Sequence, residues 1–383
     1  MTATDRRSLS ILHVFRAPVG GLFRHVADLT RGQAAAGHKV GIIADATTGG
    51  ERAETVLAAL APVLALGITR VPMSRHLGLR DIAAVRGVAG VLRADGADVV
   101  HGHGAKGGAY ARLVSGGAVR AYTPHGGTLH FSPRSPLGLL YLTLERALLR
   151  PTDLILFESA YARDVFHARI GAPAALVRVI HNGVTAAEFA PLAPDADARD
   201  LVFVGELRHL KGVDVLIEAI GLLKAAGRPV TAAIVGSGPE AAAFAALALA
   251  RGIGADLTFP GALPARQAFT RGRVLVVPSR AESLPYIVLE GAAAGVPMLA
   301  TDVGGIPEIF GPHSARLLPA GDPAKLAAAI KAALDDPAGG RAAAAALRER
   351  VRAEFTVEAM GTAVLAAYRA AIDRREGLEI PPH

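Results

Sequence analysis

Short runs of apolar residues recur along the whole chain, and each is followed by a turn and a stretch with helical spacing. The runs are Ser10–Phe15, Val40–Ala44, Ile68–Val71, Val99–His101, Val119–Thr123, Leu154–Phe157, Val177–Ile180, Leu201–Val204, Thr231–Val235, Leu257–Phe259, Val274–Val277, Met298–Thr301 and Arg316–Leu318. They are continuous rather than alternating, which is typical of parallel strands covered by helices on both faces. The pattern predicts an α/β protein with two doubly wound parallel sheets.

The segment at residues 185–200, TAAEFAPLAPDADARD, interrupts this alternation because it is rich in Pro, Ala and Asp and has no periodicity. Such a composition predicts a linker, and 383 residues are enough for two domains. We expect one domain over residues 1–184 and another over 201–355. The tail, residues 356–383, has helical spacing of its apolar residues and predicts a final helix.

The composition narrows the class of protein. Cysteine is absent, which excludes disulfides and thiolate chemistry and is compatible with a reducing compartment. No apolar run approaches the roughly 18 residues of a membrane-spanning helix, and the start MTATDRRSLSILHVF does not match a secretory signal. We therefore expect a cytoplasmic protein without an integral membrane segment.

Charge is distributed unevenly along the chain. Residues 1–183 carry 21 Lys and Arg against 12 Asp and Glu, whereas the remaining residues carry 20 against 22. A basic half predicts an anionic partner such as a membrane surface, although a solvated Arg-rich surface gives the same count. Nucleic acid is not expected as a partner, because aromatic residues are few and do not interleave with a basic patch.

Doubly wound domains bind ligands beyond the carboxyl ends of their strands, so the residues after each run are candidates. Gly20 and Gly21 open a predicted helix, where a ligand could approach the helix amides, and a tight turn explains the pair equally well. The segment after the first run is not GxGxxG, so Asp45 after the second run is only a weak indication of a dinucleotide. His125 could meet a substrate hydroxyl or serve as a core or capping residue.

Two segments invite a metal interpretation. HGHGAKGG contains His101 and His103, but the sequence reveals no third ligand, and the Walker spacing is missing. We expect these histidines to line a cleft. Asp195 and Asp197 match a DxD pattern but lie in the predicted linker, so we expect a solvated loop there.

Cationic and glycine residues follow two runs of the second half. Arg208 and Lys211 precede a predicted helix at Gly212, so cationic side chains and helix amides could converge on a diphosphate. VGSGPE places Gly236 and Gly238 before another helix, which is a weak signal because any strand–helix turn can use glycine.

The most informative segment is ESLPYIVLEGAAAGVPMLATDVGGIPEI, residues 282–309. Glu282 lies in the loop after a run, Ser283 can cap the following helix, and Pro285 is tolerated in the first turn. Glu290 then lies within that helix. A ligand at this helix start would meet amides on its phosphates and carboxylates on its hydroxyls. Alternatively, Glu282 favours the helix N-terminus electrostatically and Glu290 is solvated.

The order of these motifs resembles one family. The set is the glycine pair near the N-terminus, HNGV at 181–184, GELRHLKG, VGSGP, and E-x7-E followed by GVPMLATDVGGIPEI. It resembles the retaining glycosyltransferases of family four, also described as group 1, over nearly the whole chain. The resemblance implies the GT-B fold, with two Rossmann-like domains facing across a cleft. It also implies that the first domain binds the acceptor, the second binds the nucleotide-sugar, and the final helix returns to the first.

The resemblance also implies roles for single residues. Lys211 would neutralise the diphosphate, Glu290 would bind the ribose, and Glu282 would contact donor-sugar hydroxyls. The N-terminal glycine pair would let the diphosphate approach, and His125 would meet the donor sugar or the acceptor. Transfer would retain the anomeric configuration, with the diphosphate assisting on the face of attack, and would need neither a metal nor another cofactor.

Two positions depart from the family pattern. Glu206 stands where the family often has Arg, and Arg208 could take over from two residues later. Ser283, Leu284 and Pro285 replace a segment that is often glycine-rich. Because Pro285 removes one amide donor, the contacts of Ser283 and Leu284 with the sugar, and the choice of donor, can differ.

The prediction is a hexosyltransferase that moves a sugar from a UDP- or GDP-linked donor to a lipid-linked or growing glycan acceptor. Its place would be cell-envelope or exopolysaccharide synthesis, peripheral on the inner face of the membrane. The alternatives are an epimerase-like GT-B enzyme and a non-catalytic nucleotide-sugar-binding protein. An NAD-dependent enzyme is disfavoured because no GxGxxG follows the first run.

Overall fold

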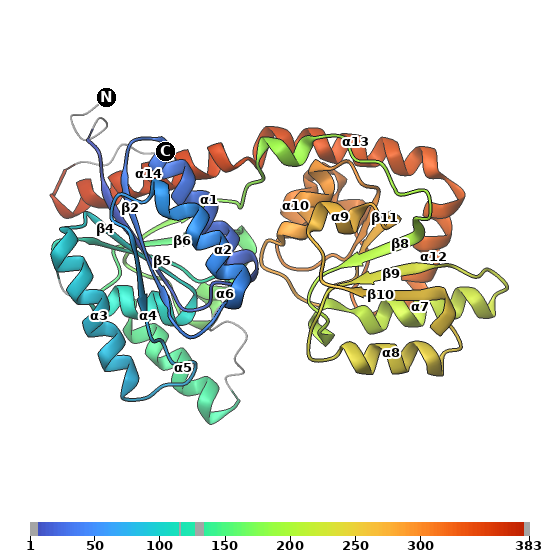
Figure 1. The fold of residues 1–383 in the computed structure, drawn as a ribbon, viewed down its shortest axis with the longest axis horizontal. Coiled ribbons are helices and arrows are strands. Elements are labelled where there is room, and N and C mark those ends of the chain that lie inside the picture. The colour runs from blue at the N-terminus through green and yellow to red at the C-terminus, as the bar shows by residue number, and fades with distance from the viewer. Residues whose placement is uncertain (1–6, 115, 127–133, 379–383) are drawn as a thin grey trace. The chain divides into compact units, whose positions relative to one another are not determined.

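The computed structural model describes residues 7–114, 116–126 and 134–378. The chain divides into two compact units, the first Met1–Asn182 with Val357–His383 and the second Gly183–Thr356. Each unit is a parallel sheet covered by helices, and Figure 1 labels the elements of both.

The first unit alternates strands and helices and ends with the last helix of the chain. Its elements are β1 Ser10–Phe15, α1 Gly20–Ala35, β2 Lys39–Asp45, α2 Gly50–Leu60, η2 Ala61–Val63, β3 Ile68–Val71, α3 Arg80–Asp95, β4 Val99–His103, α4 Gly104–Leu113, β5 Val119–Thr123, α5 Pro136–Ala147, β6 Leu154–Phe157, α6 Ala160–Arg169, β7 Leu176–Val179 and α14 Val357–Arg375.

The second unit repeats the alternation with shorter strands. Its elements are η4 Ala186–Phe189, β8 Arg199–Val204, η5 His209–Lys211, α7 Val213–Ala225, β9 Ala232–Val235, α8 Ala241–Ala250, η6 Gly254–Asp256, β10 Leu257–Gly261, α9 Ala265–Phe269, β11 Gly272–Val277, α10 Tyr286–Ala293, β12 Met298–Ala300, α11 Ile306–Phe310, η7 Gly311–Arg316, α12 Pro323–Asp335 and α13 Pro337–Glu354.

Both sheets are doubly wound. The strand order is β3-β2-β1-β4-β5-β6-β7 in the first unit and β10-β9-β8-β11-β12 in the second, and all named pairs are parallel. In each sheet the first strand of the unit, β1 or β8, lies in the interior. The chain adds strands first on one side of it and then on the other. The continuous apolar runs follow from this topology, because helices cover both faces of every central strand.

Helix α14 completes the core of the first unit. Met360, Val364 and Tyr368 are buried with Leu29 of α1 and with residues of the sheet, and α14 lies beside α1 (Figure 1). The other face of the same sheet packs against α3 and α4. The apolar spacing in the tail therefore corresponds to burial of one helix face.

Twelve of the thirteen predicted strands are present among the described residues, with ends shifted by at most two positions. The thirteenth, Arg316–Leu318, is wrong as a strand. Helix η7 continues to Arg316, and only Leu318 pairs, in an isolated bridge with Thr301. Only two residues of the run follow the end of η7, which is too few for a strand with continuous backbone pairing.

Residues 185–200, for which we predicted a linker, are ordered within the second unit. Thr185 and Glu188 form a capping box at the start of η4. The amide of Asp195 donates to the carbonyl of Thr270 at 2.8 Å, and β8 begins at Arg199. Local composition did not reveal these contacts, because they join residues far apart in the sequence.

Candidate functional site

The sheet order places a candidate site at the centre of the second unit. β8 and β11 are neighbours, but the chain leaves β8 towards β9 and leaves β11 towards β12. Open α/β sheets bind ligands beyond the carboxyl ends of the strands at such a switch point. The loop after β8 carries Lys211, and the loop after β11 carries Glu282.

Lys211 and Glu282 form an ion pair at this point. The Lys211 Nζ atom donates to both carboxylate oxygens of Glu282, at 2.7 and 2.9 Å. The Ser279 hydroxyl donates to the same carboxylate at 2.7 Å, and the Thr301 hydroxyl donates to the Ser279 carbonyl at 2.7 Å. The Lys211 side chain is 27% exposed and that of Glu282 only 9%. The structure thus brings together two predicted residues that lie 71 positions apart.

Glycines make the close approach of these loops possible. Gly212 ends η5 with a φ of +70°, and a Cβ there would lie 1.9 Å from the Pro278 carbonyl oxygen. Gly304 has a φ of +60°, and a Cβ there would lie 1.9 Å from the carbonyl oxygen of Glu282. The Gly305 amide also donates to the Ser283 carbonyl at 2.6 Å. Only glycine fits such positions without a backbone shift.

Arg280 holds the lysine loop in place, and the sequence analysis missed it. Its guanidinium makes a bidentate pair with Asp214 at 2.7 and 2.6 Å and donates to the His209 carbonyl at 2.7 Å. Burial raises the pKa of Asp214, but donation from Arg280 outweighs this and leaves the pKa below its usual value. Arg280 therefore ties the η5 turn, which ends at Lys211, to the loop after β11.

The helix after Glu282 begins later than predicted. α10 starts at Tyr286 with Pro285 at its N-cap, and its N-cap has no side-chain hydrogen bond, so the prediction that Ser283 caps this helix is wrong. The Leu284 side chain is buried in the core, which leaves its backbone as the part that a ligand could meet. Glu290 lies in the second turn of α10 and is partly buried.

The other predicted residues of this unit lie nearby in the loops after β8 and β9. Arg208 is about half exposed, and its guanidinium lies 3.6 Å from the Glu206 carboxylate. A Cβ at Gly236 or Gly238 would lie 1.8 or 2.4 Å from a backbone oxygen of the β8 loop. These glycines thus have a packing role in joining the two loops.

The first unit has its own switch point between β1 and β4. Gly20 opens α1 after β1 with a φ of +64°, and Gly21 follows it in the first turn. His125 follows β5 and has a φ of +49°, a left-handed conformation that few residues other than glycine adopt. Residues in such conformations cluster at functional sites.

Five histidines gather beneath this switch point, and the sequence analysis missed two of them, His13 and His25. His103 Nε2 lies 2.9 Å from His13 Nδ1, and His103 Nδ1 lies 3.1 Å from His125 Nε2. The rings of His25 and His125 meet edge to face at 4.8 Å. His101 lies next to His103, with ring centroids 3.9 Å apart.

Burial keeps these imidazoles neutral at pH 7. It lowers the pKa of His13 to about 4 and the pKa of His25 and of His125 to about 3. Burial also holds the pKa values of His101 and His103 well below their usual value, and the neighbouring histidines add to this effect.

A cavity of about 980 Å³ opens in the first unit and is lined by His103 and His125. Its wall is largely apolar, with Leu77, Ile82 and Leu137 among the lining residues. Several apolar side chains that line it are exposed to solvent; they are Leu77, Ile82, Leu113, Leu137 and Leu144. Basic residues also line the cavity; they are Arg16, Arg75, Arg86 and Lys106.

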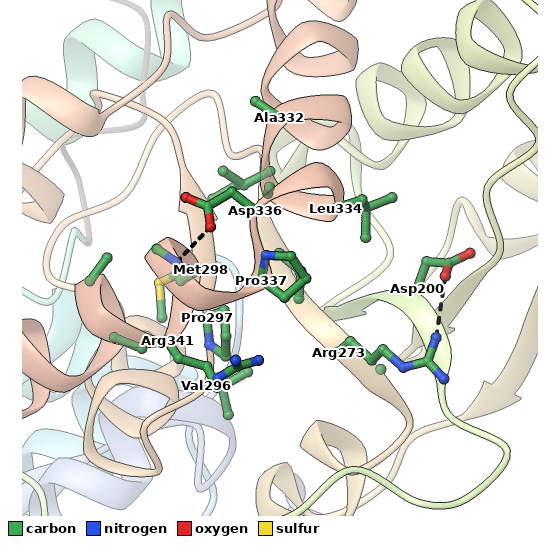
Figure 2. A pocket seen from close by; sticks show the side chains of 18 of the residues that line it. Asp200, Arg273, Val296, Pro297, Met298, Ala332, Leu334, Asp336, Pro337 and Arg341 are labelled. Atoms are coloured by element: carbon green, nitrogen blue, oxygen red, sulfur yellow. Dashed lines mark hydrogen bonds and ion pairs between the residues drawn. The ribbon is translucent and has the colours of Figure 1, made fainter.

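A second cavity, of about 760 Å³, lies in the second unit but away from the Lys211–Glu282 pair. Figure 2 shows Asp200, Arg273 and Met298 in its wall, with Asp336 and Pro337 from the junction of α12 and α13. Asp200, Arg273 and Met298 are at the amino ends of their strands, so this cavity lies at the edge of the sheet opposite to the switch-point loops. It contains none of the predicted donor residues.

Two acidic candidates have structural partners. Asp45 is buried and accepts hydrogen bonds from Thr47, Thr48 and the Met73 amide. Asp195 accepts from the Thr270 hydroxyl at 3.0 Å. Neither arrangement favours the dinucleotide or the DxD interpretation.

Two family models match consecutive parts of the chain. Residues 19–188 match the model described as Glycosyltransferase Family 4, and residues 184–354 match the model described as Glycosyl transferases group 1. The chain belongs to the family 4 glycosyltransferases. The resemblance expected from the motif order is therefore confirmed.

Curated relatives match parts of this family 4 chain. It is 32% identical over 235 residues to glycogen synthase of Mycobacterium tuberculosis H37Rv, covering 60% of the chain and 56% of that protein. It is also 32% identical over 224 residues to the GDP-mannose-dependent alpha-(1-6)-phosphatidylinositol monomannoside mannosyltransferase of M. tuberculosis CDC 1551, covering 52% and 55%. The matches thus span little more than half the length of these relatives.

Solved structures share the fold of the family 4 chain over nearly its full length. Sucrose-phosphate synthase from Thermosynechococcus elongatus is similar with a TM-score of 0.78 and 23% identity, covering 95% of this chain and 98% of that one. Anabaena HepE in complex with UDP gives a TM-score of 0.76 and 18% identity, covering 94% and 99%. The predicted GT-B fold with two Rossmann-like parallel-sheet domains is confirmed.

Within the described part of the chain, no helix combines the length and apolar character needed to cross a bilayer.

Proposed function

We propose that this protein is a retaining hexosyltransferase that moves a sugar from a UDP- or GDP-sugar to a lipid-linked or growing glycan acceptor. The second unit would bind the donor, and the first unit would bind the acceptor. The observation that carries the proposal is the Lys211–Glu282 ion pair at the switch point of the second sheet, in a chain of this family. We place the reaction in cell-envelope or exopolysaccharide synthesis, at the inner face of the membrane.

Lys211 supplies the positive charge that the departing diphosphate needs. A diphosphate that pairs with Lys211 would free the Glu282 carboxylate to accept hydrogen bonds from donor-sugar hydroxyls. Glu290, in the second turn of α10, would bind the ribose, and the backbone of Ser283 and Leu284 would face the sugar. The half-exposed Arg208 would add a second positive charge.

The transfer step follows from this arrangement. The bond from the anomeric carbon to the diphosphate breaks while the acceptor oxygen bonds to the same face of the sugar. The acceptor proton passes to the departing phosphate oxygen. Lys211 stabilises the developing negative charge, so this step needs no divalent ion at the diphosphate.

The first unit supports a lipid-linked acceptor. Its cavity at the β1–β4 switch point combines an apolar wall with basic residues, which suits a lipid tail that carries an anionic linkage. His125 lines this cavity and would meet the acceptor, and the α1 start at Gly20 and Gly21 offers helix amides to a phosphate. A curated relative whose name includes phosphatidylinositol monomannoside is consistent with such an acceptor.

The experiment is a transfer assay with a panel of UDP- and GDP-sugars and a bacterial lipid extract as acceptor. We expect release of nucleoside diphosphate that depends on both one donor and the extract. Lys211→Ala should lower the rate by about 10²–10³-fold. Lys224→Ala is the matched control, because Lys224 pairs with Asp256 away from the site, and it should leave the rate unchanged.

The assay also separates the alternatives. Donor turnover without any acceptor would favour an epimerase-like enzyme, and donor binding without turnover would favour a non-catalytic binding protein. Membrane association has its own readout, sedimentation with vesicles at low salt. Preferential binding to anionic vesicles supports the peripheral location, and equal binding to neutral vesicles contradicts the role of the basic half.

A further inference from the structure

The cavity of about 760 Å³ in the second unit has no part in the proposed function. It lies at the amino ends of β8, β11 and β12, whereas the donor loops follow the carboxyl ends of β8 and β11. Ligands of open α/β sheets bind beyond the carboxyl ends, so the proposed transfer does not use this edge. The volume nevertheless falls within the range of about 300–1,000 Å³ that is typical of small-molecule sites.

Side chains of the core form the floor of this cavity. Phe269, Val296, Phe310 and Leu347 line it, and their exposed fractions are only 1–8%. The same four residues belong to one hydrophobic core of the unit, although they come from α9, the loop before β12, α11 and α13. The cavity thus extends down to the core and offers an apolar surface to a ligand.

The segment for which we predicted a linker forms part of the wall. Leu192 and Pro194 line the cavity. Next to them, the Asp195 amide donates to the Thr270 carbonyl at 2.8 Å, and the Asp195 carboxylate accepts from the Thr270 hydroxyl at 3.0 Å. These hydrogen bonds hold the segment against the end of α9, so this wall is formed before any ligand binds, as in most ligand pockets.

The charged residues of the wall are mostly basic. Four arginines and two aspartates line the cavity; they are Arg228, Arg273, Arg316, Arg341, Asp200 and Asp336. Arg228 pairs with Asp335 at 2.6 Å, and Arg273 pairs with Asp200 at 3.5 Å, as Figure 2 shows for the second pair. The Asp336 carboxylate caps α13. Two arginines and both aspartates therefore already have partners.

Arg316 and Arg341 differ from the other two arginines. Both residues are exposed, and neither forms an ion pair with a carboxylate in the described ranges of the chain. Arg316 ends η7, and Arg341 lies in the second turn of α13. Two separate elements thus bring unpaired guanidinium groups to one cavity. A guanidinium offers several N–H donors in a plane, which suits a carboxylate or a phosphate group.

We propose that this cavity binds a small amphipathic anion, with a carboxylate or phosphate group on an apolar body. The anionic group would accept hydrogen bonds from Arg316 and Arg341, and the apolar body would cover the floor around Phe269 and Phe310. Burial of the apolar body supplies affinity because it removes apolar surface from water. The two guanidinium groups select an anion over a neutral ligand.

The first experiment is a fluorescence titration of the full-length protein with anilinonaphthalene sulfonate (ANS), whose rings are apolar and whose sulfonate is an anion. The cavity of the first unit is also apolar and basic, so Ala109→Trp fills it beforehand. We expect Ala109→Trp to keep one saturable ANS site per chain. Adding Ala343→Trp, which places a large side chain in the cavity of the second unit, should abolish that site.

A second set of variants tests the charge without filling the cavity. Arg316→Gln with Arg341→Gln, made in the Ala109→Trp protein, should weaken ANS binding by about 10-fold or more, because two charge-assisted hydrogen bonds are lost. Arg93→Gln, at an exposed arginine of α3, is the matched control and should leave the dissociation constant unchanged. Circular dichroism of each variant checks the fold, and the arginine variants remain informative if Ala343→Trp does not fold.

Competition with the dye identifies the anionic group. Octanoate carries a carboxylate, octyl phosphate carries a phosphate, and octanol has the same chain without a charge. Displacement of ANS by either anion at concentrations at which octanol has no effect supports the proposal, and the stronger competitor names the group. Equal displacement by octanol would overturn the choice of an anion.

Three further results would overturn the proposal. They are the absence of a saturable site in Ala109→Trp, unchanged binding after the arginine substitutions, and displacement of ANS by UDP or GDP, which would assign the dye to the donor loops. No readout depends on sugar transfer, so a failure here leaves the proposed function standing, and the converse also holds.

Discussion

Gly304 illustrates how single residues shape the donor loop. Its left-handed backbone lets the turn after β12 approach the carbonyl of Glu282, whose carboxylate binds Lys211. A side chain at this position would push against backbone atoms, which cannot rotate away. The geometry of the Lys211–Glu282 pair therefore depends on a residue without a functional group.

Gly304→Ala should destabilise the protein by about 2–5 kcal/mol, because it adds left-handed strain to a steric overlap. Gly321→Ala is the matched control. Gly321 has a φ of +74°, but a Cβ there meets nothing within 4 Å, so only the strain of about 1–2 kcal/mol applies. Urea unfolding of both variants checks this, and equal losses of stability would contradict the role assigned to the contact.

Site residues that a local sequence pattern marks could be predicted from the sequence. Residues whose role comes from a partner far along the chain could not. Lys211 and Glu282 were predicted because each follows an apolar run and stands before a helix. Arg280 and His25 were missed, since their partners Asp214 and Asn182 lie far along the chain. Nothing in the residues next to His25 distinguishes it from any histidine on the buried face of a helix.

At the scale of elements, the Arg280–Asp214 pair joins the η5 turn to the end of β11. Donation from Arg280 lowers the pKa of Asp214 despite burial, which raises it. A carboxyl group with a lowered pKa in the folded state adds stability above its unfolded pKa of about 3.9. This stability is lost as the pH falls through the folded value.

Asp214→Asn should therefore destabilise the protein at pH 7, and the difference from wild type should shrink as the pH is lowered to about 4 and below. Chemical unfolding of both proteins over this range measures the effect. A difference that is constant with pH would show that the charge of Asp214 does not contribute.

Helices α4 and α5 are joined by a buried ion pair. Arg112 donates to Glu145 at 2.7 Å, both side chains are almost fully buried, and the guanidinium lies 3.8 Å from the centre of the Tyr122 ring. Removing one partner leaves an uncompensated charge in the interior. The pair is thus expected to be far more sensitive to substitution than the ion pairs at the surface.

Glu145→Leu should cost about 3–5 kcal/mol, whereas the double variant Arg112→Met, Glu145→Leu should regain most of that loss. Arg251→Met breaks the more exposed Arg251–Glu218 pair and should change the free energy of unfolding far less, because solvent screens that pair. The free energies of unfolding of the four proteins test this. A double variant less stable than Glu145→Leu would contradict it.

The presence of a strand or helix could be predicted from the sequence more accurately than the residue at which it begins or ends. Twelve strands were found because buried parallel strands give continuous apolar runs. The start of α10 was placed too early, at Ser283, because a serine before a helical pattern is a common cap. Leu284 is instead drawn into the core, and the helix begins only after Pro285. Tertiary packing decided this boundary.

At the scale of the molecule, each unit uses its switch point differently. The second unit places an ion pair there, between loops that glycines hold in close contact. The first unit places neutral histidines there, below a cavity with apolar and basic walls. The excess of Lys and Arg in residues 1–183 follows the unit for which we propose an anionic lipid-linked acceptor.

The central claim is that the second unit binds a nucleotide-sugar at Lys211 and Glu290. The most direct test is thermal unfolding with UDP, GDP, ADP and their sugar conjugates, without added metal. We predict stabilisation by one base, about 2.7 kcal/mol at 100 times the dissociation constant, lost in Lys211→Ala and Glu290→Ala but kept in Lys224→Ala. Stabilisation by none of these ligands, or equal stabilisation of Lys211→Ala, would contradict the account.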